Sequence, residues 1–192
     1  MATEADPKRV TLPIIDHAPQ PYDGPSRDEV LALRRQYLTP GLITYYRDPL
    51  MIVEGYMQYV YDETGRRYLD AFAGIVTISV GHCHPKVVER VRQQAGPLQH
   101  PTTISLHPPL ALMAERLANK LPDGIDRTYF TNSGSEANEL AILSAREFTG
   151  RSDVVALRNG YHGGTSVPMS LTAHGSWRFK SNPAYNVHHT HA

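Results

Sequence analysis

The residues best suited to chemistry lie in the run Asn132-Ser133-Gly134-Ser135-Glu136, which is expected to join a strand to a helix. A helix N-terminus leaves backbone N–H groups without partners and carries a partial positive charge, so a phosphate group is stabilised there. Gly134 lets the backbone approach such a ligand closely, and the hydroxyl groups of Ser133 and Ser135 add uncharged donors. An ordinary capped helix, with Ser133 or Ser135 as the cap and Glu136 completing a capping box, explains the same run. The two interpretations are compatible.

A second turn, Gly160-Tyr161-His162-Gly163-Gly164, follows the next expected strand. Glycine on both sides of Tyr161 and His162 favours a tight or mobile turn. In parallel α/β sheets, ligands bind beyond the carboxyl ends of the strands, so the two turns should line one crevice. Phosphate donors from one turn and an aromatic face from the other suit a phosphorylated planar heterocycle, because aromatic rings stack on one another.

Two histidine groups are weaker candidates for a metal site. His82, Cys83 and His84 offer three possible ligands, but the flanking Gly81 and Pro85 favour a turn into a helix instead. The second group is His188, His189 and His191, for which an ordinary loop is the better explanation. We therefore assign no metal.

A hydrolase is a further weak candidate. Ser133 or Ser135 would be the nucleophile, His162 the base and Asp153 the residue behind it. The G-x-S-x-G sequence of such enzymes is absent, because position 131 is threonine.

The elements that position these residues follow from periodicity and from glycine and proline breaks. An irregular arm is expected over residues 1–27, and a boundary between an antiparallel and a parallel part near residue 100. The expected helices cover residues 28–38, about 86–94, 108–121 and 135–148. The expected strands cover residues 51–53, 58–61, 67–69, 127–131 and 153–157, the last of them buried. Residues 185–192 resemble a chain interrupted within a loop.

Composition excludes several classes of protein. The 192 residues are 41% hydrophobic and 20% charged, which is typical of a soluble globular protein and too apolar for a disordered chain. The formal net charge is zero and no apolar run approaches the roughly 18 residues of a membrane span, so neither nucleic acid nor a membrane is an expected partner. A single cysteine and an acidic N-terminus without an apolar signal core predict a cytoplasmic location.

Four segments together resemble the class III aminotransferases, which are pyridoxal-phosphate enzymes of the ω-amino-acid type. The segments are Tyr61–Asp70, Gly81–Pro85, Asn132–Asn138 and Gly160–Gly163, and their order and spacing cover about residues 40–175. Within the family, Tyr45-Tyr46 and the Gly81–Pro85 segment are most similar to the alanine–glyoxylate aminotransferase branch.

The resemblance implies an α/β fold. A small N-terminal antiparallel α+β part, consisting of an arm and a small-domain segment, would occupy residues 1–100. The first strands and helices of the fold-type I pyridoxal-phosphate-dependent transferase large domain would follow over residues 101–192, incomplete.

The resemblance also implies roles for single residues. Ser133, Gly134 and Ser135 would hold the phosphate of pyridoxal 5′-phosphate, Tyr161 would stack on its pyridine ring, and His162 would lie beside the ring. The family usually has arginine after the Tyr-His-Gly triplet, whereas this chain has Gly164.

No catalytic residue is assigned. In the family, the Schiff-base lysine, the aspartate that pairs with the pyridine nitrogen and the substrate-binding arginine would fall beyond residue 192. The lysines present are in no matching context: Lys8, Lys86, Lys120 and Lys180. Because transamination needs a lysine amine as anchor and as proton carrier, the chain as given is expected not to transaminate.

The implied parent activity is transfer of an amino group from an amino acid such as alanine to an oxo acid such as glyoxylate. The intact enzyme is expected to be a homodimer or a larger homo-oligomer. The alternative within the class is a transaminase of the 4-aminobutyrate, β-alanine or ornithine type. The alternative of another class is a non-catalytic fragment that only binds phosphate or pairs with other chains.

Overall fold

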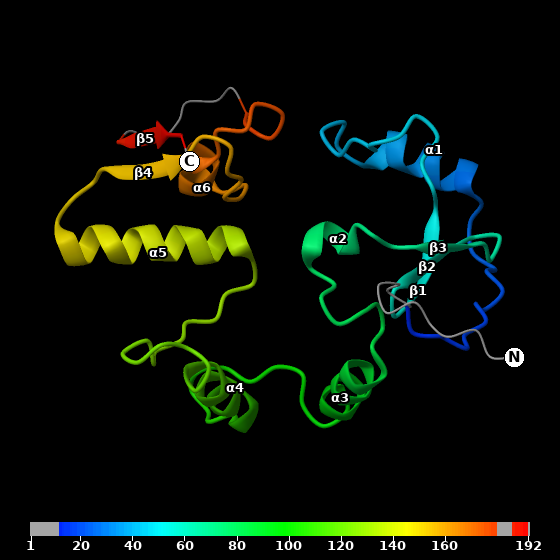
Figure 1. Cartoon of the computed structure of the whole chain (residues 1–192), viewed down its shortest axis with the longest axis horizontal. Helices are drawn as coiled ribbons and strands as arrows, with labels where there is room; N and C mark the ends of the chain where they lie inside the picture. Colours follow the sequence, from blue (N-terminus) through cyan, green and yellow to red (C-terminus); the bar gives the residue numbers. More distant parts are fainter. Residues whose placement is uncertain (1–11, 180–185, 192) are drawn as a thin grey trace, which may run out of the picture. The chain divides into compact units, whose positions relative to one another are not determined.

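The computed structural model describes residues 12–179 and 186–191, which form two compact units (Figure 1). The N-terminal unit ends at Ile104 and the C-terminal unit begins at Ser105. Both contain helices and strands, so the expected α/β class is confirmed. The assignment of residues 1–100 to a small domain and of residues 101–192 to a cofactor-binding domain stays a prediction. Of the expected arm, residues 1–11 lie outside the described residues, and residues 12–25 contain no helix or strand.

Helix α1, Arg27–Tyr37, begins at a complete capping box. The Ser26 hydroxyl accepts a hydrogen bond from the Glu29 N–H at 3.3 Å, and the Glu29 carboxylate accepts one from the Ser26 N–H at 2.7 Å. Basic residues in the last turn complement the negative end of the helix dipole. The helix predicted over residues 28–38 is therefore confirmed.

Three short strands form an antiparallel sheet in the order β1-β2-β3: β1, Ile52–Tyr56; β2, Tyr59–Asp62; and β3, Arg67–Leu69. The register pairs Tyr56 with Tyr59 and Tyr59 with Leu69. Aromatic and β-branched residues favour such half-buried strands, and all three strands were expected from the sequence. Tyr61 is only 2% exposed and anchors the small core of this sheet.

The turn between β2 and β3 is organised by the Asp62 carboxylate. It accepts hydrogen bonds from the Thr64 N–H at 2.9 Å, the Thr64 hydroxyl at 2.7 Å and the Arg66 N–H at 3.0 Å. The Tyr68 hydroxyl donates a fourth at 2.7 Å. These bonds, with that from the Thr64 hydroxyl the largest effect, lower the pKa of Asp62 to about 2. Gly65 supplies the positive φ, +80°, that closes the turn.

A left-handed turn follows the sheet and was not expected. It is α2, Ala73–Val76, in which all four residues have φ values between 51° and 59°. Ile75 and Val76 are β-branched and disfavour this conformation, so nothing in the local sequence predicts it. Helix α3, Pro85–Ala95, confirms the predicted helix and starts at Pro85, since proline fits the first helical turn.

The C-terminal unit contains three helices and two parallel strands among its described residues. Helix α5, Gly134–Thr149, is followed along the chain by β4, Val154–Leu157 (Figure 1). Strand β4 pairs with β5, Val187–Thr190, in a parallel register that starts at Val154 and Val187. The other helices are α4, Pro108–Ala118, and α6, Ser166–Leu171, of which α6 was not expected.

Two predictions about strands in this unit were wrong. The strand expected over residues 127–131 does not form, because a strand needs a hydrogen-bonding partner and the only strands described in this unit pair with each other. The helix expected from about residue 108 to 121 is confirmed as α4, although it ends at Ala118 with Asn119 as its C-cap. Strand β5 forms where an interrupted loop was expected, since its pairing with β4 supplies the hydrogen bonds that the histidine-rich sequence alone does not indicate.

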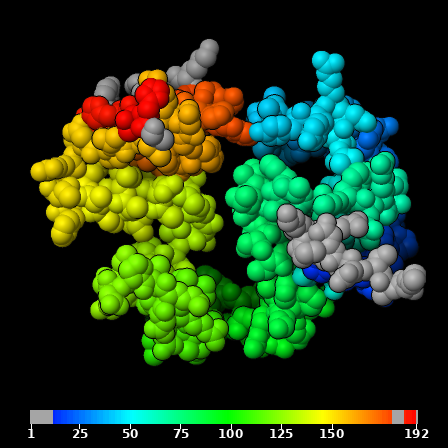
Figure 2. All heavy atoms as spheres, viewed as in Figure 1, coloured from blue at the N-terminus to red at the C-terminus, as the bar shows by residue number. Residues whose placement is uncertain are grey.

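The two-stranded sheet and α5 leave much apolar surface uncovered. Strand β4 was expected to be buried, but only Ala156 is buried in it, while Val155 is 68% exposed. On α5, Leu143 is 62% and Phe148 92% exposed. Figure 2 shows α5 and β4 at the surface of the unit. A sheet of two strands is too small to cover the exposed side chains of β4, which explains why the predicted burial of this strand was wrong. None of the described helices is both long and apolar enough to cross a membrane.

Candidate cofactor site

The first turn of α5 is a capped helix N-terminus. Ser133 has extended backbone, and its hydroxyl accepts a hydrogen bond from the Glu136 N–H at 3.1 Å. The Glu136 carboxylate accepts from the N–H of Asn132 at 2.7 Å, one residue earlier than in the expected capping box. The Glu136 N–H is thus occupied, whereas the N–H groups of Gly134 and Ser135 have no acceptor within the described part of the chain.

The second turn lies against the start of α5. The Ser135 hydroxyl oxygen accepts a hydrogen bond from the Gly164 N–H at 3.0 Å. A Cβ atom at Gly163 would lie 2.9 Å from the Ser135 Cα and would overlap the Ser135 hydroxyl, and Gly163 has a φ of +128°. The Thr165 hydroxyl donates to the Glu139 carboxylate at 2.7 Å. The structure therefore brings the two turns together, and glycine at 163 permits the contact.

The backbone of His162 is held from two sides by residues whose roles the sequence did not indicate. The Asn138 side-chain amide donates to the His162 carbonyl oxygen at 2.8 Å. The His162 N–H donates to the Thr172 hydroxyl at 2.9 Å, and that hydroxyl donates to the Pro168 carbonyl oxygen at 3.0 Å. Thr172 is fully buried. Asn138 was visible in the Asn132–Asn138 segment, but no sequence signal marked Thr172.

The side chains of Tyr161 and His162 differ in exposure. The Tyr161 ring is 61% exposed and meets the Trp177 ring edge to face, with ring centroids 6.3 Å apart at an interplanar angle of 70°. The His162 ring folds back over Gly160, where an added Cβ would lie 2.6 Å from its Nε2 atom. This Nε2 atom is buried and has no hydrogen-bond partner. An unpaired buried polar atom carries a free-energy cost, which a ligand or a water molecule can relieve.

The donor set fits a phosphorylated aromatic ring. Gly134 and Ser135 offer two free N–H groups, and the Ser135 hydroxyl keeps its own proton because it acts as an acceptor towards Gly164. Tyr161 offers an exposed aromatic face on the turn that touches Ser135. Ser133 contributes chiefly as the helix cap. The roles expected for Ser133, Gly134, Ser135, Tyr161 and His162 in cofactor binding stay predictions, which this geometry supports for all of them except Ser133.

Neither histidine group forms a metal site in the part of the chain that the structure describes, since no three His, Cys, Asp or Glu side chains converge there. His82 Nε2 lies 2.7 Å from the Asp70 carboxylate and keeps the pKa of Asp70 below its usual value. His84 caps α3 by accepting from the Lys86 N–H, and Cys83 is exposed.

The C-terminal histidines have separate partners. His188 pairs with Asp153 at 2.7 Å, His189 with the Leu171 carbonyl oxygen at 3.0 Å, and His191 with Arg158 at 3.3 Å. Asp153 precedes β4, whereas His162 follows it, and Asp153 is engaged by His188. The hydrolase arrangement of Ser135, His162 and Asp153 is therefore not assembled.

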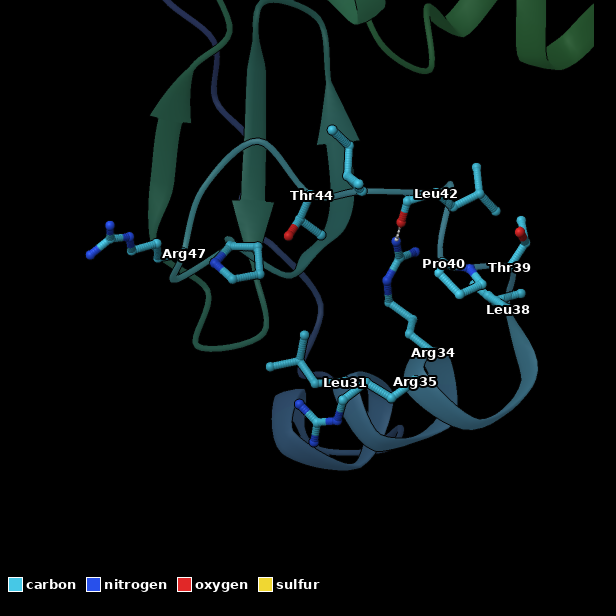
Figure 3. A pocket seen from close by; sticks show the side chains of 11 residues that line it. Leu31, Arg34, Arg35, Leu38, Thr39, Pro40, Leu42, Thr44 and Arg47 are labelled. Carbon is cyan, nitrogen blue, oxygen red and sulfur yellow. Dashed lines mark hydrogen bonds between the residues drawn. The ribbon is translucent and has the colours of Figure 1, made fainter. Parts of the chain in front are cut away.

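A separate cavity of about 570 Å³ lies in the N-terminal unit, between α1 and the segment over residues 38–49. In Figure 3, the Arg34 side chain crosses it to reach the Leu42 carbonyl oxygen, a hydrogen bond of 2.9 Å. The Arg47 side chain lies at its margin and points away in that view. The cavity contains none of the residues of the two turns.

Comparisons with known proteins show the family to which this chain belongs. The model of the family described as aminotransferase class-III matches residues 44–190. The chain is 49% identical over 187 residues to alanine–glyoxylate aminotransferase 2 homolog 2, mitochondrial, of Arabidopsis thaliana, which covers 97% of this chain. It is 40% identical over 169 residues to alanine–glyoxylate aminotransferase 2, mitochondrial, of Homo sapiens, and 38% identical over 153 residues to acetylornithine aminotransferase of Methanocaldococcus jannaschii. The chain spans 39% of the Arabidopsis protein and 33% of the human one.

Solved structures show the same architecture. A thermostable (S)-enantioselective ω-transaminase from Thermomicrobium roseum superposes with a TM-score of 0.77 at 29% identity, over 88% of this chain and 41% of that one. Taurine:2-oxoglutarate aminotransferase from Bifidobacterium kashiwanohense, solved in complex with PLP and glutamate, gives a TM-score of 0.78 at 25% identity, over 88% of this chain and 39% of that one.

Proposed function

Because the chain belongs to the class III aminotransferase family, whose members depend on pyridoxal 5′-phosphate, we propose that it supplies the cofactor-holding part of an aminotransferase. The single observation that supports this most is the Ser135–Gly164 hydrogen bond of 3.0 Å, which joins the turn with phosphate donors to the turn with an exposed aromatic ring. When bound, the cofactor supplies an electron sink for reactions at the amino carbon of the substrate.

Each residue of the site has a defined task. The N–H groups of Gly134 and Ser135 and the Ser135 hydroxyl bind the phosphate at the positive end of α5. Tyr161 stacks on the ring and sets its plane. His162 lies beside the ring through its place in the same turn, and Gly163 permits the approach to Ser135.

Alanine as amino donor and glyoxylate as acceptor are the substrates we propose for the intact enzyme. Similarity to the two alanine–glyoxylate aminotransferases named above supports this choice. The acetylornithine aminotransferase relative supports an ornithine-type donor as the second candidate. The test uses the protein encoded by the full reading frame, assayed with alanine, N-acetylornithine, 4-aminobutyrate and β-alanine against glyoxylate and 2-oxoglutarate. A preference for N-acetylornithine with 2-oxoglutarate over alanine with glyoxylate would refute the proposed substrates.

We further propose that residues 1–192 alone hold the cofactor without transaminating. Lys86 lies at the start of α3 and Lys120 follows α4, neither of them in a sequence context that matches the family's lysine, and Lys8 and Lys180 lie outside the described residues. The test incubates the chain with pyridoxal phosphate, reduces it with borohydride and maps the peptides. A stoichiometric adduct at one lysine, together with alanine-to-glyoxylate transfer, would contradict the proposal.

A further inference from the structure

Side chains on one face of α5 form hydrogen bonds to the turn that carries Tyr161. Ser135, Asn138 and Glu139 stand at positions i, i+3 and i+4, which place side chains on the same face of a helix. Each bonds to a different residue of the turn: Ser135 to Gly164, Asn138 to His162 and Glu139 to Thr165. The helix that presents the phosphate donors therefore also fixes the aromatic turn.

The peptide of His162 is the most constrained point of this contact. Its carbonyl oxygen accepts from Asn138 on α5, and its N–H donates to Thr172 at the end of α6. The Thr172 hydroxyl also donates its proton to the Pro168 carbonyl oxygen inside α6, and Thr172 is 0% exposed. A buried hydroxyl with both bonds made has one orientation, so it holds the His162 N–H in one direction.

We propose that Asn138 and Thr172 are positioning residues of the cofactor site: by holding the two sides of the His162 backbone, they set the place of the Tyr161 ring relative to the phosphate donors of α5. Among the described residues, the side-chain hydrogen bonds of Asn138 and Thr172 go to His162 and Pro168, not to the ring of Tyr161 or to the phosphate donors. Their effect runs through the main chain of His162, which is bonded directly to Tyr161. This inference rests on the proposed cofactor site and adds to it two residues that act at a distance.

The alternative to a positioning role is that Thr172 only stabilises the end of α6, as a buried residue whose hydroxyl is hydrogen-bonded. That role would loosen the whole unit when the hydroxyl is removed, and binding of phosphate at α5 would weaken as well. A positioning role affects the ring and leaves phosphate binding unchanged. Two probes separate the roles: pyridoxamine 5′-phosphate, which has ring and phosphate and no aldehyde to react with surface amines, and inorganic phosphate, which has no ring.

The experiment measures equilibrium dissociation constants of both probes for the 192-residue chain and for the variants Thr172→Val, Thr172→Ser and Asn138→Leu. Valine keeps the shape of threonine without its hydroxyl, serine keeps the hydroxyl, and leucine has nearly the shape of asparagine without its N–H donor and without an added charge beside the phosphate donors. We expect Thr172→Val and Asn138→Leu to weaken pyridoxamine phosphate binding about fivefold each, the size of one hydrogen bond, with phosphate binding unchanged. Thr172→Ser should restore wild-type binding.

A double variant that combines Thr172→Val with the Asn138 substitution gives a further test. Because both residues act on one peptide, the combined loss should be smaller than the product of the single losses. Equal weakening of both probes by Thr172→Val, or pyridoxamine phosphate binding that no variant changes, would overturn the positioning role. A wild-type chain that binds neither probe would refute the proposed cofactor site itself, which is a different result.

Discussion

The antiparallel sheet of the N-terminal unit and the two joined turns of the C-terminal unit are stabilised in different ways. In the sheet, every hydrogen bond to the Asp62 carboxylate comes from a residue no more than six positions away. In the turns, the bonds from α5 join residues 24 to 29 positions apart, as between Asn138 and His162 or Ser135 and Gly164. Local bonds form wherever the hairpin forms, whereas long-range bonds need the helices to be placed first.

The two regions also differ in how well they are covered. Apolar side chains of the sheet range from Tyr61, 2% exposed, to Leu69, 53% exposed, while Phe148 on α5 is 92% exposed and Val155 on β4 is 68% exposed. Large exposed apolar side chains mark surfaces that other parts of a protein normally cover. We infer that the hairpin is the more self-sufficient region and that the cofactor turns are the region more sensitive to substitution at a few contacts.

The largest effect is expected from Asp62→Ala. The substitution removes the acceptor of four hydrogen bonds, and a bond to a charged group contributes about 1.5–3 kcal/mol, so a loss of about 3 kcal/mol is expected for the hairpin. Hydrogen exchange measured by mass spectrometry should show lost protection over residues 52–70 and unchanged protection over residues 134–149. Glu63→Ala is the matched control. Protection lost equally in both regions would show that they are not separate in stability.

A smaller effect is expected from two substitutions in the turns. Tyr161→Ala removes ring stacking, which contributes about 0.5–1.5 kcal/mol beyond area burial. Ser135→Ala removes a hydroxyl donor to the phosphate and should cost about 1 kcal/mol or somewhat more. Pyridoxamine phosphate affinity is the measurement, and protection over residues 52–70 should not change. If both variants bind as the wild-type chain does, the site residues are wrongly assigned.

The pH dependence of the hairpin gives the smallest signal. The folded-state pKa of Asp62 is lowered from 3.8 to about 2, so its contribution to stability is present above about pH 4 and is lost as pH falls towards 2. The amide proton shifts of Thr64 and Arg66, which donate to this carboxylate, should titrate with a midpoint near 2 in NMR spectra. Asp62→Asn should abolish that titration. A midpoint near 3.8 in the wild-type chain would mean that the hydrogen bonds do not persist in solution.

The contrast between local and long-range hydrogen bonds also explains which parts of the structure the sequence could predict. The strands around Asp62 and the helix that starts at Pro85 were predicted because their signals are local: turn residues, β-branched runs and a proline at the helix start. The absence of a strand over residues 127–131 and the presence of β5 were not predictable, because each depends on a partner strand distant in sequence. Residues of the turns were found from their types, but the buried Thr172 was not, since its role exists only once α6 lies against the turn.

We propose that the two turns form one cofactor site, and substitutions of the adjacent glycines Gly163 and Gly164 test this most directly. A side chain at Gly163 would overlap Ser135, whereas nothing lies within 4 Å of a Cβ at Gly164. Gly163→Ala should therefore separate the turns and weaken pyridoxamine phosphate binding by about tenfold or more, the effect of strain and contact loss of roughly 1–3 kcal/mol. Gly164→Ala should bind as the wild-type chain does, since it keeps the N–H that donates to Ser135. Equal affinity in both variants would contradict the claim that the approach of the two turns creates the site.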